Sequence, residues 1–293
     1  MSVSIIVNPI SGGASPEKGR RRAELASEVL DQARETGDVS VTERRGHARE
    51  LASAAVRRGA RLVIAWGGDG TMNEVASALA FTSTPLGLVA AGSGNGLARE
   101  LGVSRRPEQA IRSALAARPR AIDLGDANGR LFVNMAGVGF DAFVAAAFDS
   151  ASNRRRGLST YVGIATRALF SYKPDRYAVS VGGDRREASA ILVTFANSRQ
   201  FGNGALIAPR ARIDDGRLDL VVVEERARWR TVCQVPRLFS GSLERMREYV
   251  TQPFDHAIVE TDAPMTFHVD GEPVQTGTRL EVRVRPGALR VAV

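Results

Sequence analysis

Hydrophobic residues in the first 120 positions form short runs that alternate with longer stretches of helical spacing. The runs "VSIIV", "VSVTE", "RLVIAW" and "LGLVA" are typical of strands, and Asn8-Pro9 cuts off the first of them. Ser15-Pro16 is a strong helix start, because serine caps a helix and proline fits its first position. We expect strands at 3–7, 39–43, 61–66 and 86–90, and helices at 15–36, 47–58 and 72–80. Strands interleaved with helices favour an α/β fold with a doubly wound parallel sheet.

After Pro119 the pattern changes, and strands dominate. The stretch 120–139 predicts two strands around an Asn128-Gly129 hairpin turn. We expect further strands at 176–183, 186–198, 217–225, 256–261, 265–271, 279–287 and 289–293, and helical patches at 140–170 and 229–239. Regular turns between the strands favour an antiparallel β-sandwich. The sequence therefore predicts one domain at 1–120 and a second at 121–293, with a last strand that could rejoin either.

Composition narrows the class of protein. The chain has 293 residues, 44% of them hydrophobic, so two ordered domains are expected. Its net charge of +8 comes almost wholly from arginine and would attract phosphate groups. The single cysteine and three histidines disfavour both disulfides and a zinc site. No long apolar segment is present, so we expect no signal peptide and no membrane span, and a cytoplasmic protein.

Three glycine-rich loops follow predicted parallel strands, namely "NPISGG" (8–13), "GGDGT" (67–71) and "AGSGNG" (91–96). Ligands bind at this edge of a parallel sheet, and glycine lets backbone amides approach an anion. The first loop alone could be a tight turn. An aspartate between glycines, at Asp69, is not needed for a turn and points to phosphate chemistry. The Walker pattern is absent, and the spacing does not fit a dinucleotide-binding first strand.

Together, "VNPISGG", "GGDGTMNEV", "PLGLVAAGSGNGLARELG", "NMAGVGFDA" and "IDDGRLDLVVV" resemble the bacterial diacylglycerol kinase and lipid kinase family. That family shares its catalytic domain with sphingosine and ceramide kinases. The resemblance implies a first domain, similar to phosphofructokinase and NAD kinase, that binds ATP and Mg²⁺. It also implies a β-sandwich second domain that receives the lipid.

In the first domain, the resemblance implies contacts to the nucleotide from all three loops and from a strand end. The implied residues are Asn8, Thr42, Gly68, Asp69, Gly70, Thr71, Asn73, Glu74, Gly92, Ser93, Gly94 and Asn95. Phosphoryl transfer needs positioning and charge neutralisation. We therefore expect Asp69 to be the main catalytic carboxylate, by metal binding, base action or both.

In the second domain, the resemblance implies three further acids and a structural metal. Asp123 would help to organise the water around Mg²⁺, and "VDGE" would supply a proton acceptor, with Glu272 preferred to Asp270. Without the resemblance, Asp123 would be a strand-end residue and "DGE" a turn. The Asp215-Gly216 turn would bind a structural Mg²⁺ through Asp215 and the carbonyls of Arg212 and Arg217.

A lipid kinase must reach a substrate in a bilayer, so we expect a lipid presented by a membrane surface and peripheral contact at the inner membrane. Residues 153–173 combine an arginine cluster with an apolar helical pattern, which suits contact with a membrane surface. The same pattern also fits a solvated run of charges that caps a helix packed on the core. Dispersed arginines and few aromatics disfavour nucleic acid. The sequence leaves a homodimer open.

Two alternatives to a lipid kinase remain at this point. An NAD kinase-like enzyme also carries "GGDGT", and a nucleotide-binding regulator could have lost catalysis.

Overall fold

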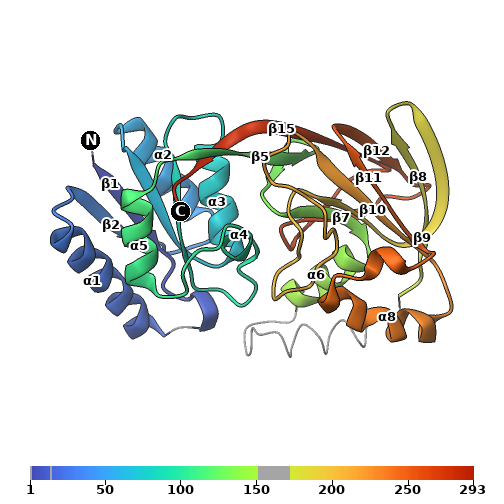
Figure 1. Ribbon diagram of the computed structural model, residues 1–293, viewed down its shortest axis with the longest axis horizontal. Coiled ribbons are helices and arrows are strands. Elements are labelled where there is room, and N and C mark those ends of the chain that lie inside the picture. The colour runs from blue at the N-terminus through green and yellow to red at the C-terminus, as the bar shows by residue number, and fades with distance from the viewer. Residues whose placement is uncertain (1, 14, 151–171) are drawn as a thin grey trace. The chain divides into compact units, whose positions relative to one another are not determined.

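The computed structural model describes residues 2–13, 15–150 and 172–293 (Figure 1). Its contacts divide the chain into two compact units. The first contains Met1–Ile122 and Gly287–Val293, and the second contains Asp123–Pro286. The change of unit falls within strand β5 (Arg120–Ala127), and the last strand, β15 (Arg279–Val291), begins in the second unit and ends in the first.

The first unit is built on a parallel sheet. Its strands run in the order β4-β3-β1-β2, and Val291 at the end of β15 pairs in parallel with Leu86 of β4. The strands are β1 (Val3–Val7), β2 (Gly37–Val41), β3 (Leu62–Gly67) and β4 (Leu86–Ala90). The helices are η1 (Ser11–Gly13), α1 (Pro16–Gln32), α2 (His47–Arg57), α3 (Asp69–Leu79), α4 (Gly96–Glu100) and α5 (Pro107–Ala116).

Helices cover both faces of this sheet (Figure 1). Alternate strand residues such as Ile5 and Ile64 share a core with α1 and α5, and Trp66 lies in the same core. The intervening residues Ile6 and Val63 point to the other face. They are also fully buried, where α2 and α3 pack. The prediction of a doubly wound parallel sheet is therefore confirmed.

Two local features of the first unit differ from the sequence prediction. Helix α1 ends at Gln32 rather than near residue 36, because Arg34 adopts a left-handed φ of 56° and the next strand starts at Gly37. Helix α5 was not predicted, although Pro107 stands at its first turn, where proline marks helix starts.

The second unit is an antiparallel β structure. Its strands are β5, β6 (Arg130–Phe132), β7 (Met135–Gly139), β8 (Asp175–Val181), β9 (Asp184–Ala196), β10 (Leu218–Glu224), β11 (Tyr249–Phe254), β12 (His256–Glu260), β13 (Thr266–Val269), β14 (Glu272–Gln275) and most of β15. Its helices are α6 (Phe140–Ser150), α8 (Arg228–Ser240) and η2 (Leu243–Arg245). The long strand β9 pairs with β8 along its first half, and with β7 and β10 along its second half.

Strand β10 shows why a sandwich forms. Its residues alternate between two hydrophobic cores: Leu220 and Val222 belong to the larger one, and Val221 and Val223 to a smaller one that includes Tyr249. Because successive side chains point to opposite faces, a strand buried on both sides must be apolar almost throughout. This explains the continuous run "LVVV" and confirms the prediction of an antiparallel sandwich-like second domain.

Several strand predictions in this unit needed correction. The Asn128-Gly129 hairpin exists between β5 and β6, but β7 is a separate strand, and β11 and β14 were not predicted. The two last predicted strands form one strand, β15, that continues through Pro286-Gly287. Asp215-Gly216 is a hairpin signal in the sequence, but it turns the chain in a loop before β10 and does not connect two strands.

The helical patch predicted at 140–170 begins as α6. The proposed membrane-contact segment 153–173 lies outside the described residues, apart from its last two positions. Among the helices that the structure describes, none combines the length and apolar character required to cross a bilayer.

Candidate active site

The glycine-rich loops follow β1, β3 and β4, so the parallel sheet brings them to one edge. The Asn8 side chain donates from Nδ2 to the Thr71 hydroxyl oxygen at 2.9 Å, which joins the first loop to the second. Its Oδ1 accepts the Ile10 amide at 3.1 Å and tightens the first loop. A Cβ at Gly12 would collide with the carbonyl oxygen of Ala91, so the first loop also approaches the third.

Asp69 joins the second loop to the third. It is the first residue of α3, directly after Gly68, and it is half-buried. Its Oδ2 accepts the Asn95 amide at 2.8 Å, and its Oδ1 accepts the Gly96 amide at 2.7 Å. Charge-assisted bonds of this kind are short and strong. The carboxylate therefore lies at the sheet edge, where it holds a loop, and is not sealed in the core.

The third loop is also closed on itself by Asn95. This residue has a left-handed φ of 53°. Its Oδ1 accepts the Gly92 amide and its Nδ2 donates to the Gly92 carbonyl, both at 2.8 Å. A Cβ at Gly92 would lie 2.7 Å from the Cα of Gly68, so only glycine lets these loops meet. Ser93, at the tip, is exposed.

The other predicted nucleotide residues have different surroundings. Thr42 is buried, and its amide donates to the Val7 carbonyl at 2.9 Å, beside the end of β1. Glu74 accepts the amides of Gly46 and Ala48 at 2.8 and 3.1 Å, and so caps helix α2. Gly70, Thr71 and Asn73 lie in the first turns of α3. The structure thus brings Asn8, Asp69, Thr71 and the 92–95 loop together, whereas the Glu74 carboxylate is engaged at α2.

In the second unit, Asp270 is bound by backbone amides. Its Oδ2 accepts the Val133 amide at 2.8 Å, and its Oδ1 accepts the amides of Asn134 and Met135 at 2.8 and 3.0 Å. Asp270 and Gly271 have φ values of 48° and 85°, which form the tight turn between β13 and β14. Glu272 follows as the first residue of β14 and is half-buried.

Asp123 and the Asp215 turn meet in the same unit. Asp123 is 3% exposed, and its Oδ2 accepts the Gly216 amide at 2.7 Å. The Asp215 carboxylate accepts the Arg217 amide at 3.1 Å, and Arg212 pairs with Asp214 at 3.8 Å. Burial and the nearby Asp215 charge raise the pKa of Asp219. Within the described residues, no group of three His, Cys, Asp or Glu side chains could hold a metal, so a cation here would need backbone carbonyls.

Comparisons with known proteins agree with this architecture. A diacylglycerol kinase catalytic domain model matches residues 2–127, and a YegS C-terminal NAD kinase beta sandwich-like domain model matches residues 134–293. A Chromohalobacter salexigens protein described as "Probable lipid kinase YegS-like" is 31% identical over 90% of this chain and 87% of its own. A Pseudomonas aeruginosa protein of the same description is 32% identical over 86% and 83%. The chain belongs to the YegS-like lipid kinase family.

Solved structures show that the fold is shared. A diacylglycerol kinase from Bacillus anthracis has a TM-score of 0.73 at 18% identity, over 99% of this chain and 96% of its own. Another chain from the same strain has a TM-score of 0.81 at 21% identity, over 99% and 94%.

Two residues of this lipid kinase family member support the candidate site, although the sequence did not single them out. The Arg22 guanidinium of α1 donates to the carbonyls of Asn8 and Ser11 at 3.2 and 3.1 Å. Burial lowers its pKa from the usual value for arginine, but a guanidinium stays charged at neutral pH. Because Arg22 is one of three adjacent arginines, no local signal distinguishes it.

Asn197 is the second such residue. It is fully buried, and its Nδ2 donates to the carbonyls of Asp123 and Val133 at 2.9 and 2.8 Å. It thereby links the strand of Asp123 to the segment whose amides hold Asp270. A polar "NS" directly after the buried end of β9 was the available signal.

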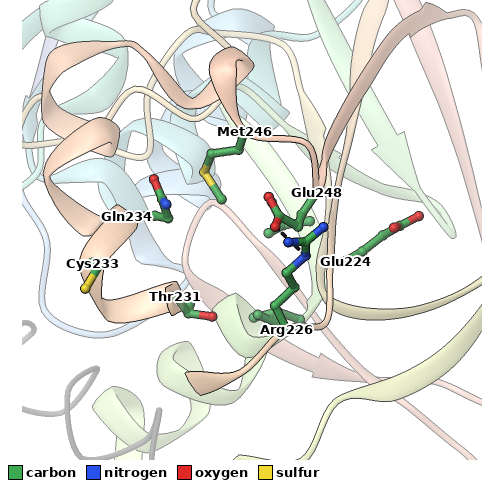
Figure 2. Close-up of a pocket in the computed structure, with 9 residues that line it drawn as sticks. Glu224, Arg226, Thr231, Cys233, Gln234, Met246 and Glu248 are labelled. Carbon is green, nitrogen blue, oxygen red and sulfur yellow. Dashed lines mark ion pairs between the residues drawn. The ribbon is translucent and has the colours of Figure 1, made fainter. Parts of the chain in front are cut away.

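A cavity of about 310 Å³ lies in the second unit between α8 and the sheet (Figure 2). Arg226 and Glu248 form an ion pair at its side, and Cys233 and Gln234 come from α8. None of the predicted site residues line it. The candidate phosphate site is therefore the loop edge of the first unit and not this cavity.

Proposed function

We propose that this member of the lipid kinase family uses ATP and Mg²⁺ to phosphorylate the hydroxyl of diacylglycerol or a related lipid. The observation that carries the proposal is the meeting of three glycine-rich loops at one sheet edge. Asn8 and Thr71 join two of them, and the Asp69 carboxylate holds the third. Family membership supports the transfer of phosphate to a lipid.

The loop edge fits a polyphosphate. Gly12 and Gly92 let the loops approach one another at points where a Cβ would collide with backbone atoms. Glycine-rich backbone at a strand end also lets amides approach a phosphate without interference from side chains. The amino end of α3 adds a partial positive charge. The Arg22 guanidinium is bonded to the carbonyls of Asn8 and Ser11 in the first loop and adds a full positive charge.

Asp69 is the proposed catalytic carboxylate. Mg²⁺, when bound, neutralises charge on the transferred group. A carboxylate oxygen can accept more than one hydrogen bond, so the amides of Asn95 and Gly96 leave Asp69 able to act through metal-bound water or as a base. The same amides fix the direction of the carboxylate before substrate arrives, which reduces the cost of reorganisation.

We extend the proposal to the second unit. Glu272 would accept the proton of the lipid hydroxyl, and Asp123 would organise water near the metal. Asp270, with three amide partners, would hold the turn in place. Asp215 with the carbonyls of Arg212 and Arg217 would bind a structural cation, and the pairing of Arg212 with Asp214 draws one positive charge away.

The proposed partner is a lipid surface rather than a dissolved metabolite. The basic segment 153–173 would approach anionic headgroups, each basic side chain contributing about 1 kcal/mol. Binding of the protein to vesicles with and without phosphatidylglycerol tests this contact separately from catalysis.

The test of function is a lipid-panel kinase assay. The protein is incubated with γ-labelled ATP, Mg²⁺ and mixed micelles that contain diacylglycerol, a sphingoid base, ceramide or phosphatidylglycerol, and products are identified by mass spectrometry. We expect label in one lipid and none when Mg²⁺ is chelated. ATP binding without transfer to any lipid would refute a lipid kinase and favour a non-catalytic regulator.

One observation favours a second candidate, an NAD kinase. The model that matches the second domain is described as NAD kinase beta sandwich-like. An assay arm with NAD as acceptor decides between the two, because NADP formation without lipid phosphorylation would select this candidate.

A further inference from the structure

A buried carboxylate and a buried imidazole meet in the second unit. Asp141 of α6 is 7% exposed, and His268 of β13 is 3% exposed. Their Oδ2 and Nε2 atoms are 3.2 Å apart. The Thr194 hydroxyl donates to the same Oδ2 at 2.8 Å, and the Ala142 amide donates to Oδ1 at 2.8 Å. These donors offset the cost of burying a carboxylate.

The hydrogen bonds define the state of the imidazole. His268 Nδ1 accepts the Gly271 amide at 3.3 Å, so this nitrogen carries no proton. The proton of the neutral ring therefore lies on Nε2, where it is donated to Asp141. A carboxylate that fixes a histidine tautomer in this way also fixes the orientation of the ring.

The strand beside His268 makes room for this arrangement. Gly137 of β7 is the register partner of His268. A Cβ at Gly137 would collide with the Asp141 carboxylate, so glycine is required for the carboxylate to reach the imidazole.

The imidazole contacts the turn that carries the proposed proton acceptor. Gly271 lies between Asp270 and Glu272, and the Asp270 carboxylate holds the turn through the amides of residues 133–135. His268 holds it through the Gly271 amide. The turn is thus fixed by a carboxylate and by an imidazole whose own direction Asp141 sets.

We propose that His268, oriented by Asp141, is a positioning residue that fixes the Gly271 amide and so places the Glu272 carboxylate for proton transfer. This inference rests on the proposed function. It gives the buried Asp141–His268 pair a role in kcat beyond packing, because small displacements of a reacting group slow catalysis strongly.

Three variants separate this role from packing. His268→Gln keeps a donor near the position of Nε2 for Asp141 but loses the acceptor for Gly271. His268→Asn keeps an acceptor near the position of Nδ1 but loses the donor. Thr194→Val removes a different partner of Asp141 and leaves the turn contact intact. For each, kcat, KM for ATP and lipid, thermal stability and hydrogen exchange at the Gly271 amide are measured.

We expect His268→Gln to lower kcat about tenfold with KM for ATP unchanged, since the turn is displaced while the nucleotide loops are not. The Gly271 amide should exchange faster in this variant. His268→Asn, which keeps the acceptor for Gly271 but loses the bond to Asp141, should have a kcat between those of His268→Gln and wild type. Thr194→Val should lower thermal stability but keep kcat. If His268→Gln keeps kcat within about twofold of wild type, or if Thr194→Val lowers kcat equally, the inference is overturned.

The exchange measurement does not depend on activity. A wild-type chain that phosphorylates no lipid would overturn the proposed function, whereas unchanged exchange at Gly271 in His268→Gln would overturn the positioning role.

Discussion

The two units hold candidate acids in the same way but assemble them from different distances along the chain. Asp69 binds two amides that lie 26 and 27 residues later, in the same run of strands and loops. Asp270 binds three amides that lie 135 to 137 residues earlier. In the first unit, local chain order and a parallel sheet suffice to bring the site together. In the second, the site exists only after most of the domain has folded.

The comparison predicts that substitution of Asp69 mainly lowers the rate of phosphate transfer, whereas substitution of Asp270 mainly lowers the stability of the second unit. Asp69→Asn keeps the size of the side chain but removes the charge. We expect the rate of phosphate transfer to fall by roughly 10²–10⁴-fold, the range for a lost acid–base group. One of the amides of Asn95 and Gly96 also loses its acceptor, so a smaller loss of stability accompanies the loss of rate.

Asp38→Asn is the matched control for Asp69. Asp38 lies in the same unit, where its partly exposed carboxylate pairs with Arg58 at 3.5 Å. Its loss should leave transfer unchanged. Normal turnover in Asp69→Asn, measured beside this control, would remove Asp69 from the site.

The second prediction concerns the space around the same carboxylate. A Cβ at Gly94 would lie 2.7 Å from Asp69 Oδ2, so Gly94→Ala must displace the carboxylate or the loop. We expect activity to fall up to about 10²-fold, because a misplaced reacting group is slow. Gly277→Ala is the control, since its Cβ would meet nothing within 4 Å. Equal activity of the two variants would show that the contact with Asp69 is not needed.

The difference between the units also explains what could be predicted from sequence. The doubly wound sheet followed from alternating runs and helical stretches, and the three loops were visible because each is continuous in sequence. The bonds of Asp69 to Asn95 and Gly96 were not visible; Asn95 was in the predicted set, and Gly96 was recognised only as the end of the third loop. A parallel sheet brings the carboxyl ends of its strands to one edge, so the loops that follow these strands lie close together in space.

The second unit was harder to predict from sequence, for a physical reason. Strand β11 contains Pro253 and strand β14 contains Pro273, and proline weakens the sequence pattern that predicts a strand. Both segments nevertheless form strands, because β11 pairs with β10 and β14 pairs with β13. "DGE" read as a turn, which it is, but its amide partners are distant in sequence. No local pattern marks His268, and the polar pair after β9 does not reveal what Asn197 contacts, because both roles depend on long-range register.

The third prediction tests the contacts of Asp270 with the backbone amides of residues 133–135, which are distant in sequence. Asp270→Asn replaces one acceptor oxygen by a donor that faces the amides of residues 133–135, so at least one buried amide loses its partner. We expect a loss of about 1–3 kcal/mol in the stability of the second unit. Hydrogen exchange at Val133, Asn134 and Met135 should accelerate, with the exposed Asp184→Asn as control. Protection that stays equal in both variants would contradict the structural role of Asp270.

The smallest effect concerns Glu74, the predicted nucleotide residue that the structure places at α2. Its carboxylate accepts the amides of Gly46 and Ala48, a task that Gly46 as cap residue cannot perform because it has no side chain. Glu74→Ala should therefore lower stability by about 0.5–2 kcal/mol, as the loss of a helix cap does. Chemical denaturation and ATP titration of the same variant separate the two roles. Lower stability with an unchanged KM for ATP fits a cap, whereas a raised KM in an equally stable protein would return Glu74 to the nucleotide site.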